Sequence, residues 1–295
     1  MYIPIKSEPR LSGLGWFIDA TIGTTRTSAG HEKLTELAAS GLVKDPNDLA
    51  ALNNGTRLPD LADPKDHIKS GEEHRHFLRS AKHSSLEAWG FAIGHLKILH
   101  QQMMSSSNPV TQFRLIGEAL HLIQDSFAPA HVNREPATGD ILNIFSYGPT
   151  APRGNHLFHV DPRDNPFTTK PRPALTPDAR RAIGCSREYL RMALRHIQLK
   201  QMPFHDPKRD LNAFISRRLW LKRPDLRLGS SGVWVQELEG WLNGAIGARN
   251  LNVSLLRTGG KFDSDMQTAV LAFQNATSLT PNGIVGKETW QKLLL

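Results

Sequence analysis

One stretch near the middle of the chain carries a carboxylate and two histidines at spacings that suit a metal ion. Residues 117–131 read Gly-Glu-Ala-Leu-His-Leu-Ile-Gln-Asp-Ser-Phe-Ala-Pro-Ala-His. His121 and Asp125 are four residues apart, so on a helix their side chains share one face. Pro129 is expected to end or bend that helix, which would bring His131 back toward the same point. A carboxylate with two imidazoles predicts a site for a divalent cation.

The helix that carries this motif is expected to be buried, because its own apolar residues cover nearly all of its faces. Buried charged groups need partners, and a cation would satisfy all three side chains at once. The alternative is a hydrogen-bonded His121–Asp125 pair with an unrelated His131 on the surface, since such pairs also occur in protein cores. The spacing alone leaves both interpretations open.

Other candidate ligands lie elsewhere in the chain, and each one alone has an ordinary explanation. Asp60 ends a Gly-Thr-Arg-Leu-Pro-Asp segment that is expected to be a turn, where an aspartate often caps the backbone. His31 begins an expected helix, and a His-x-His pair over 74–76 could be a solvated face. The last group, over 154–161, could be a polar loop; its candidates are His156, His159 and Asp161.

The elements that must position these residues are mostly helices. All 13 histidines fall within residues 1–205, and the last 90 residues have none. Apolar periodicity predicts helices over 31–42, 84–104, 111–128 and 177–202, whereas strand signals are scarce. We therefore expect a helical domain over 1–205, followed by a proline- and cation-rich linker over 206–225 that includes a short helical run, 209–221. The fold class predicted for the whole chain is all-α.

The last 70 residues have a different pattern, in which helical segments over 232–243 and 265–276 alternate with glycine-rich turns. Val235, Leu238 and Leu242 share one helical face, and a Phe273-Gln274 pair precedes Asn282-Gly283 and Trp290. This order resembles the peptidoglycan-binding module of many cell-wall hydrolases, over residues 226–295. The resemblance implies a small three-helix domain whose partner is peptidoglycan. Glu239 and Asn282 stand where that family usually has Gln and Asp.

The candidate ligands of the first region, taken in order, resemble the zinc-dependent phospholipase C family. They include a His at the start of an early helix, Gly-x3-Pro-Asp, His-Phe and His-x3-Asp-x5-His, spread over roughly residues 10–200. The resemblance implies an all-α domain with two or three zinc ions that hydrolyses the head-group phosphodiesters of phospholipids. Fungal single-strand nucleases share that fold, so a nuclease or phosphatase remains an alternative.

Carried over by motif, the resemblance implies a specific set of metal ligands: His31, Asp60, His76, His121, Asp125, His131, His156 and His159. It also implies that Asp60 accepts the proton of the attacking water. Two departures stand out. The family's amino-terminal tryptophan ligand would have to be Trp16, exposed by cleavage after Gly15. The last family pair is a His with a carboxylate four residues later, but here Asp161 follows His156 at five.

Composition limits the class of protein. With 39% hydrophobic and 22% charged residues the chain is typical of globular proteins, and no apolar run approaches the ~20 residues of a membrane span. Cys185 is the single cysteine, so no intrachain disulfide can form. The net charge of +8 favours an anionic partner: phospholipid, acidic wall polymer or nucleic acid.

Together the two regions predict a zinc-dependent phospholipase C-like hydrolase anchored to bacterial peptidoglycan and acting on the membrane surface. The first residues do not read as a cleavable signal peptide, so we expect export to the envelope or periplasm by another route. An antibacterial effector, with secretion machinery and an immunity protein as partners, would fit. The alternatives are a zinc nuclease or phosphatase, for which nucleic acid is a substrate, and a non-catalytic wall-binding protein with structural metal.

Overall fold

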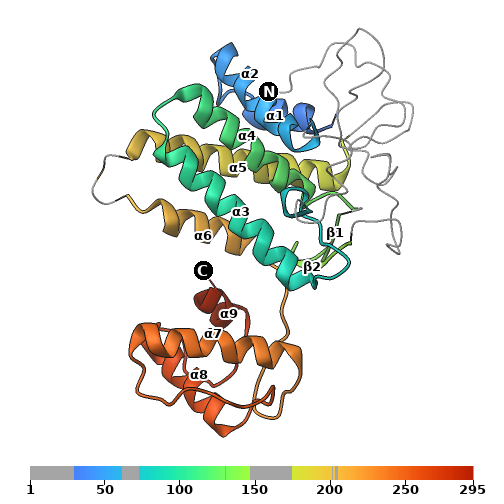
Figure 1. Ribbon diagram of the computed structural model, residues 1–295. Helices are drawn as coiled ribbons and strands as arrows, with labels where there is room; N and C mark the ends of the chain where they lie inside the picture. Colours follow the sequence, from blue (N-terminus) through green and yellow to red (C-terminus); the bar gives the residue numbers. More distant parts are fainter. Residues whose placement is uncertain are drawn as a thin grey trace. The chain divides into compact units, whose positions relative to one another are not determined.

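The computed structural model describes residues 30–61, 73–129, 131–146, 175–200, 202 and 205–294, and the chain divides into two compact units, Met1–Leu221 and Lys222–Leu295 (Figure 1). Across these ranges the chain is mostly helical and has two short strands, which confirms the predicted helical fold class. None of the described helices combines the length and apolar character needed to cross a membrane. The first unit contains α1 (His31–Ala39), α2 (Pro46–Leu61), the 3-10 helix η2 (Glu73–His76), α3 (Ser85–Ser105), α4 (Pro109–Asp125), β1 (Val132–Arg134), β2 (Ile141–Ile144), α5 (Pro177–Leu199) and α6 (Pro207–Arg218).

The long helices begin where the sequence supplies a capping side chain. Asn108 accepts a hydrogen bond from the Thr111 N–H at the start of α4, and Thr176 does the same for Ala179 at the start of α5. A proline follows each cap, at a position that has no helical partner for an N–H. At α3, Ser84 and Glu87 bond each other's backbone N–H in a capping box.

Helix α4 forms the centre of the first unit. Every residue from Leu115 to Asp125 is buried, as expected for a helix that is apolar nearly all round. The helix packs against α1, α2, α3 and α5, and Figure 1 shows α3, α4 and α5 lying side by side. Any polar group on this half of α4 must therefore find its partners inside the protein.

Helices α2 and α4 approach so closely that only glycine fits at the crossing. A Cβ on Gly117 would lie 2.1 Å from the Leu52 carbonyl oxygen, and one on Gly55 would lie 1.9 Å from the Arg114 carbonyl oxygen. These positions have no tolerance for a side chain because the obstructing atoms are backbone. The close approach brings the last turns of α2 against the face of α4 that carries His121.

The expected turn at Gly55–Asp60 is helical instead and forms the C-terminal part of α2. Pro59 lies inside the helix, where it removes only one backbone N–H, and the helix ends two residues later at Leu61. Packing of the buried Leu52 and Thr56 in α2 supplies the stability that the local sequence lacks. Asp60 is thus held by a helix rather than by a turn.

The expected linker over 206–225 also differs from the structure. Leu211, Phe214 and Ile215 of α6 are buried, and Trp89 of α3 donates its indole N–H to the Leu219 carbonyl at 2.6 Å. The ring of Trp220 lies 5.9 Å from that of Trp89. Residues through Leu221 therefore belong to the first unit, because an apolar helix face lies among the prolines and cations that suggested a linker.

A short antiparallel hairpin of β1 and β2 follows α4 and fixes the path of the chain after it. Arg134 donates from Nε to the Ser126 carbonyl at 2.7 Å, and its guanidinium lies 3.9 Å from the centroid of the Phe127 ring. The same side chain donates to the Gly139 carbonyl. Arg134 thereby holds the turn that carries the chain from Asp125 to His131.

The second unit contains α7 (Val233–Arg249), α8 (Ser264–Ala276) and α9 (Lys287–Leu294). Gln274 of α8 is buried against the turn before α9. Its Nε2 donates to the Ile284 carbonyl at 2.9 Å, and its Oε1 accepts from the Gly283 N–H at 3.0 Å. Trp290 is fully buried, and its indole donates to the Pro224 carbonyl at 3.2 Å. The Phe-Gln pair of the sequence thus has a structural role, since its glutamine holds a turn in place.

Gly117→Ala is expected to destabilise the first unit by about 1–3 kcal/mol or more, because the new methyl group overlaps the backbone of α2. Gly184→Ala is the matched control. It lies in α5 with nothing within 4 Å of the added Cβ, and should stabilise the unit by about 0.5–1 kcal/mol. Chemical denaturation followed by circular dichroism measures both. Equal stabilities for the two variants would contradict the close crossing.

Candidate metal centre

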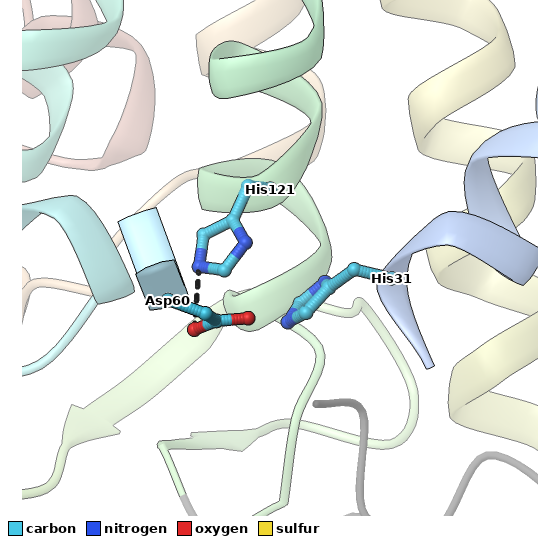
Figure 2. Close-up of side chains that lie close together, drawn as sticks. All are labelled: His31, Asp60 and His121. Atoms are coloured by element: carbon cyan, nitrogen blue, oxygen red, sulfur yellow. Dashed lines mark ion pairs between the residues drawn. The ribbon is translucent and has the colours of Figure 1, made fainter. Parts of the chain in front are cut away.

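Five histidine and aspartate side chains from four elements converge at the carboxyl end of α4. Figure 2 shows three of them, with the imidazoles of His31 from α1 and His121 from α4 and the Asp60 carboxylate from α2 facing one another. His76 from η2 and Asp125 from α4 complete the group. His31, His121 and Asp125 are 0% exposed. Ligand atoms of His31, Asp60 and His121 lie within 4.8 Å of one another, as do those of His76, His121 and Asp125.

The Asp125 carboxylate lies at the centre of the contacts. Its Oδ1 is 3.1 Å from His31 Nε2, and its Oδ2 is 3.0 Å from His121 Nε2 and 3.3 Å from His76 Nδ1. Oδ1 accepts no hydrogen bond from the described part of the chain. A fully buried carboxylate in this position requires positive charge close by.

Asp60 faces the same group from α2. Its Oδ1 is 3.7 Å from His76 Nδ1 and 3.8 Å from His121 Nε2. The two imidazole nitrogens are themselves 3.0 Å apart. Two carboxylates and several ring nitrogens are therefore directed at one small volume.

Backbone carbonyls fix which nitrogen of two of these rings carries the proton. His121 Nδ1 is 2.9 Å from the Thr56 carbonyl oxygen, and His131 Nδ1 is 2.7 Å from the His76 carbonyl oxygen. A carbonyl only accepts, so both Nδ1 atoms must be protonated donors. In the neutral rings, Nε2 then carries the lone pair.

A chain of side chains fixes the tautomer of His31 in the same way. Thr56 Oγ1 donates to the Leu52 carbonyl at 3.0 Å, so the 3.2 Å contact between the Thr35 and Thr56 hydroxyls requires Thr35 to donate. Gln124 Nε2 then donates to Thr35 Oγ1 at 2.9 Å, which directs Gln124 Oε1 at His31 Nδ1, 2.8 Å away. His31 Nδ1 is therefore a donor, and its Nε2 lone pair faces Asp125.

Neutral His31 and His121 thus direct lone pairs at the same carboxylate, and this arrangement is repulsive unless a positive charge lies between them. A proton on His121 is one solution. Burial disfavours its charged form, but Asp125 and Asp60 outweigh this effect and raise the pKa of His121 to about 9. Burial likewise opposes ionisation of Asp125, yet the neighbouring His121 and His131 hold the pKa of that carboxyl well below its usual range. A divalent cation is the other solution, and it needs neutral rings.

The residues fit a divalent transition metal. Metal-binding histidines generally donate their other ring N–H to a carbonyl or carboxylate, as His31, His121 and His131 do here. Atoms bound to one zinc ion at about 2.0–2.1 Å lie roughly 3.3 Å apart in a tetrahedron. The closest ligand-atom separations in the cluster, from 3.0 Å to 3.8 Å, bracket that value. Mixed imidazole and carboxylate ligands suit zinc, manganese and iron.

The backbone next to His76 is in a conformation that bulky residues seldom adopt. Phe77 has a φ of 50°, in the left-handed region, and its ring is completely buried. Such a conformation costs on the order of 1–3 kcal/mol and persists only where the surroundings enforce it. Here, burial of the ring offsets the strain and directs the His76 carbonyl toward His131.

The structure brings His31, Asp60, His76, His121 and Asp125 together as the sequence motifs suggested. His131 lies beside them, with Nδ1 3.8 Å from Asp125 Oδ2. The ring of His74, the other histidine of the His-x-His pair, lies against His95 with the ring centroids 4.9 Å apart. The remaining sequence candidates lie outside the described residues; they are Trp16, His156, His159 and Asp161.

The sequence interpretation missed Gln124 and Thr56, which orient the ligands without belonging to them. Gln124 stands beside Asp125 on a helix that is buried on every side, and it is itself completely buried. Because buried polar side chains are nearly always hydrogen-bonded, a glutamine there signals a specific partner. Thr56 orients His121 through its backbone carbonyl, and every residue type has one, so the sequence could not indicate this role.

Comparison with known proteins finds a match within the second unit. Residues 231–293 match the family model described as a putative peptidoglycan binding domain. The C-terminal region therefore carries a peptidoglycan-binding helical domain, which supports a wall-binding role and confirms that part of the sequence interpretation. No curated protein and no solved structure matches the chain. The phospholipase C resemblance of the first region has no family-model match and stays a prediction.

Proposed function

We propose that the first unit is a metal-dependent phosphodiesterase of the phospholipase C type, held at the bacterial wall by the second unit. The observation that carries the proposal is the convergence of two carboxylates and three imidazoles, with His31 and His121 fixed in the tautomer that a metal requires. A structural site usually surrounds one ion with four ligands, whereas this cluster presents more ligands than one ion uses. The surplus supports a catalytic centre with more than one ion.

Zinc bound here would polarise a phosphoryl oxygen and lower the pKa of a bound water, which are the requirements of phosphodiester hydrolysis. The chain's own residues hold and orient the reacting groups. Asp60 is suited to accept the proton of the attacking water, because its Oδ1 faces the cluster at the longer distances of 3.7 Å and 3.8 Å. Asp125 is committed to the imidazoles at 3.0–3.3 Å and keeps them in place.

The peptidoglycan-binding domain argues for work in the bacterial envelope, where phospholipid lies close to the wall. The net charge of +8 favours approach to anionic membrane surfaces. Delivery as an antibacterial effector, with its own secretion machinery and immunity protein, is part of the same proposal. The positive charge equally suits nucleic acid, so a nuclease on the same centre is the second candidate.

Asp60→Asn is expected to lower head-group release from phospholipid vesicles by about 10²–10⁴-fold, because it removes a proton acceptor. His76→Gln should lower it as well, whereas His74→Gln, two residues away in η2 and outside the cluster, should leave it unchanged. Release of phosphorylated head groups is measured on purified full-length protein with added zinc.

Unchanged release by Asp60→Asn would contradict the proposed role of that residue. Degradation of single-stranded nucleic acid without head-group release would favour the nuclease. If protein shown to contain metal has neither activity, the remaining interpretation is a wall-binding protein with structural metal.

Trp290→Ala is expected to abolish co-sedimentation with peptidoglycan while leaving vesicle hydrolysis intact. Removing a fully buried tryptophan costs about 3–5 kcal/mol, which a domain of this size can hardly absorb. Phe91→Ala removes an aromatic ring that is 51% exposed in the first unit and should leave sedimentation unchanged. Full wall binding by Trp290→Ala would place the wall contact outside the second unit.

A further inference from the structure

A second group of metal-ligating side chains lies at the junction of α5 and α6. His196 stands in the last turn of α5, His205 directly precedes the Asp206 cap of α6, and Asp210 lies in the first turn of α6. Figure 1 shows these ends of α5 and α6 next to each other and away from η2, which carries His76. The group shares no residue with the candidate metal centre.

The three side chains face one another closely enough to share an ion. One ligand atom from each lies within 4.8 Å of the other two. His196 Nε2 is 3.2 Å from Asp210 Oδ2, and the rings of His196 and His205 are 4.6 Å apart at an interplanar angle of 63°. His196 is completely buried, and the other two residues are half-buried.

His205 supplies an independent sign of a missing ligand. Its Nε2 is buried and has no hydrogen-bond partner among the described residues. A buried polar atom without a partner costs on the order of a lost hydrogen bond and calls for an explanation. A cation held between His205, His196 and Asp210 would satisfy this nitrogen.

The orientation of His196 is set from behind by a buried hydrogen-bonded pair. His196 Nδ1 is 2.9 Å from His100 Nε2, and His100 Nδ1 is 3.1 Å from the Tyr189 hydroxyl. The hydrogen bonds that link His196, His100 and Tyr189 can run in either direction, because imidazole and phenol groups can each donate or accept. With His196 Nδ1 donating to His100, the Nε2 lone pair points at Asp210 as a metal requires.

Arg195 competes with a cation for Asp210, since its Nη2 lies 3.2 Å from Asp210 Oδ2. The Arg195 side chain is 62% exposed, and exposed ion pairs of this kind contribute little stability. Its guanidinium can move into solvent when a divalent ion binds. The carboxylate is therefore available to the cation.

We propose that His196, His205 and Asp210 bind one divalent transition-metal ion, with zinc the best match to two imidazoles and a carboxylate. The bound ion would link the last turn of α5 to the first turn of α6. This site does not depend on the proposed hydrolytic function.

The test is the zinc content of the purified full-length chain, measured by mass spectrometry after exposure to zinc and removal of unbound metal. Asp210→Asn and His205→Gln should each bind one ion per chain fewer than the wild type. Asp206→Asn is the matched control, because asparagine caps α6 as aspartate does and the side chain lies outside the cluster. Circular dichroism confirms that each variant is folded.

Equal zinc content in His205→Gln, Asp210→Asn and the control would overturn the proposal. His121→Ala separates the two sites, because it should lose ions from the first centre yet keep the ion that His205→Gln loses. A wild type with one ion, lost in His205→Gln and kept in His121→Ala, would support this site and count against the hydrolytic centre.

Discussion

The first unit depends on the burial of a carboxylate, Asp125, at the end of a helix that contacts other helices on several sides. An ionised carboxylate removed from water is tolerated only with opposite charge and hydrogen-bond donors around it. That requirement explains why His31, His76 and His121 come from three separate elements to the same point. It also explains the close crossing of α2 and α4, because the glycines there let the Thr56 carbonyl reach the His121 ring.

Much of this arrangement was predictable from local sequence signals. The i,i+4 spacing of His121 and Asp125 places both on one face, and the capping residues mark where α4 and α5 begin. Asp60 lies with the other candidate ligands, but the expected turn around it was wrong, because Pro59 suggested a turn where α2 continues. Packing of α2 against α4 overrides that signal, and this packing cannot be deduced from the sequence around Pro59 alone.

Other features depended on contacts that are distant in sequence. The tautomer of His31 is set through Gln124, Thr35, Thr56 and Leu52, residues of three helices whose proximity exists only in the fold. The helical run over 209–221 was expected but was assigned to a linker, because cations and prolines conceal the buried face of α6, which includes Phe214. The wall-binding domain was easier, since its turns and its Phe-Gln pair are local and recur in a known family.

The second unit matches a peptidoglycan-binding family model, which supports a wall-binding role, and the first unit has a cluster in which ring nitrogens of His31 and His121 face the Asp125 carboxylate. Anomalous diffraction at the zinc absorption edge, from crystals of the zinc-loaded full-length chain, tests the central claim most directly. We predict a peak between His121 Nε2 and the Asp125 carboxylate, in contact with His31 or His76. No peak there, with those side chains joined by direct hydrogen bonds, would contradict the metal centre.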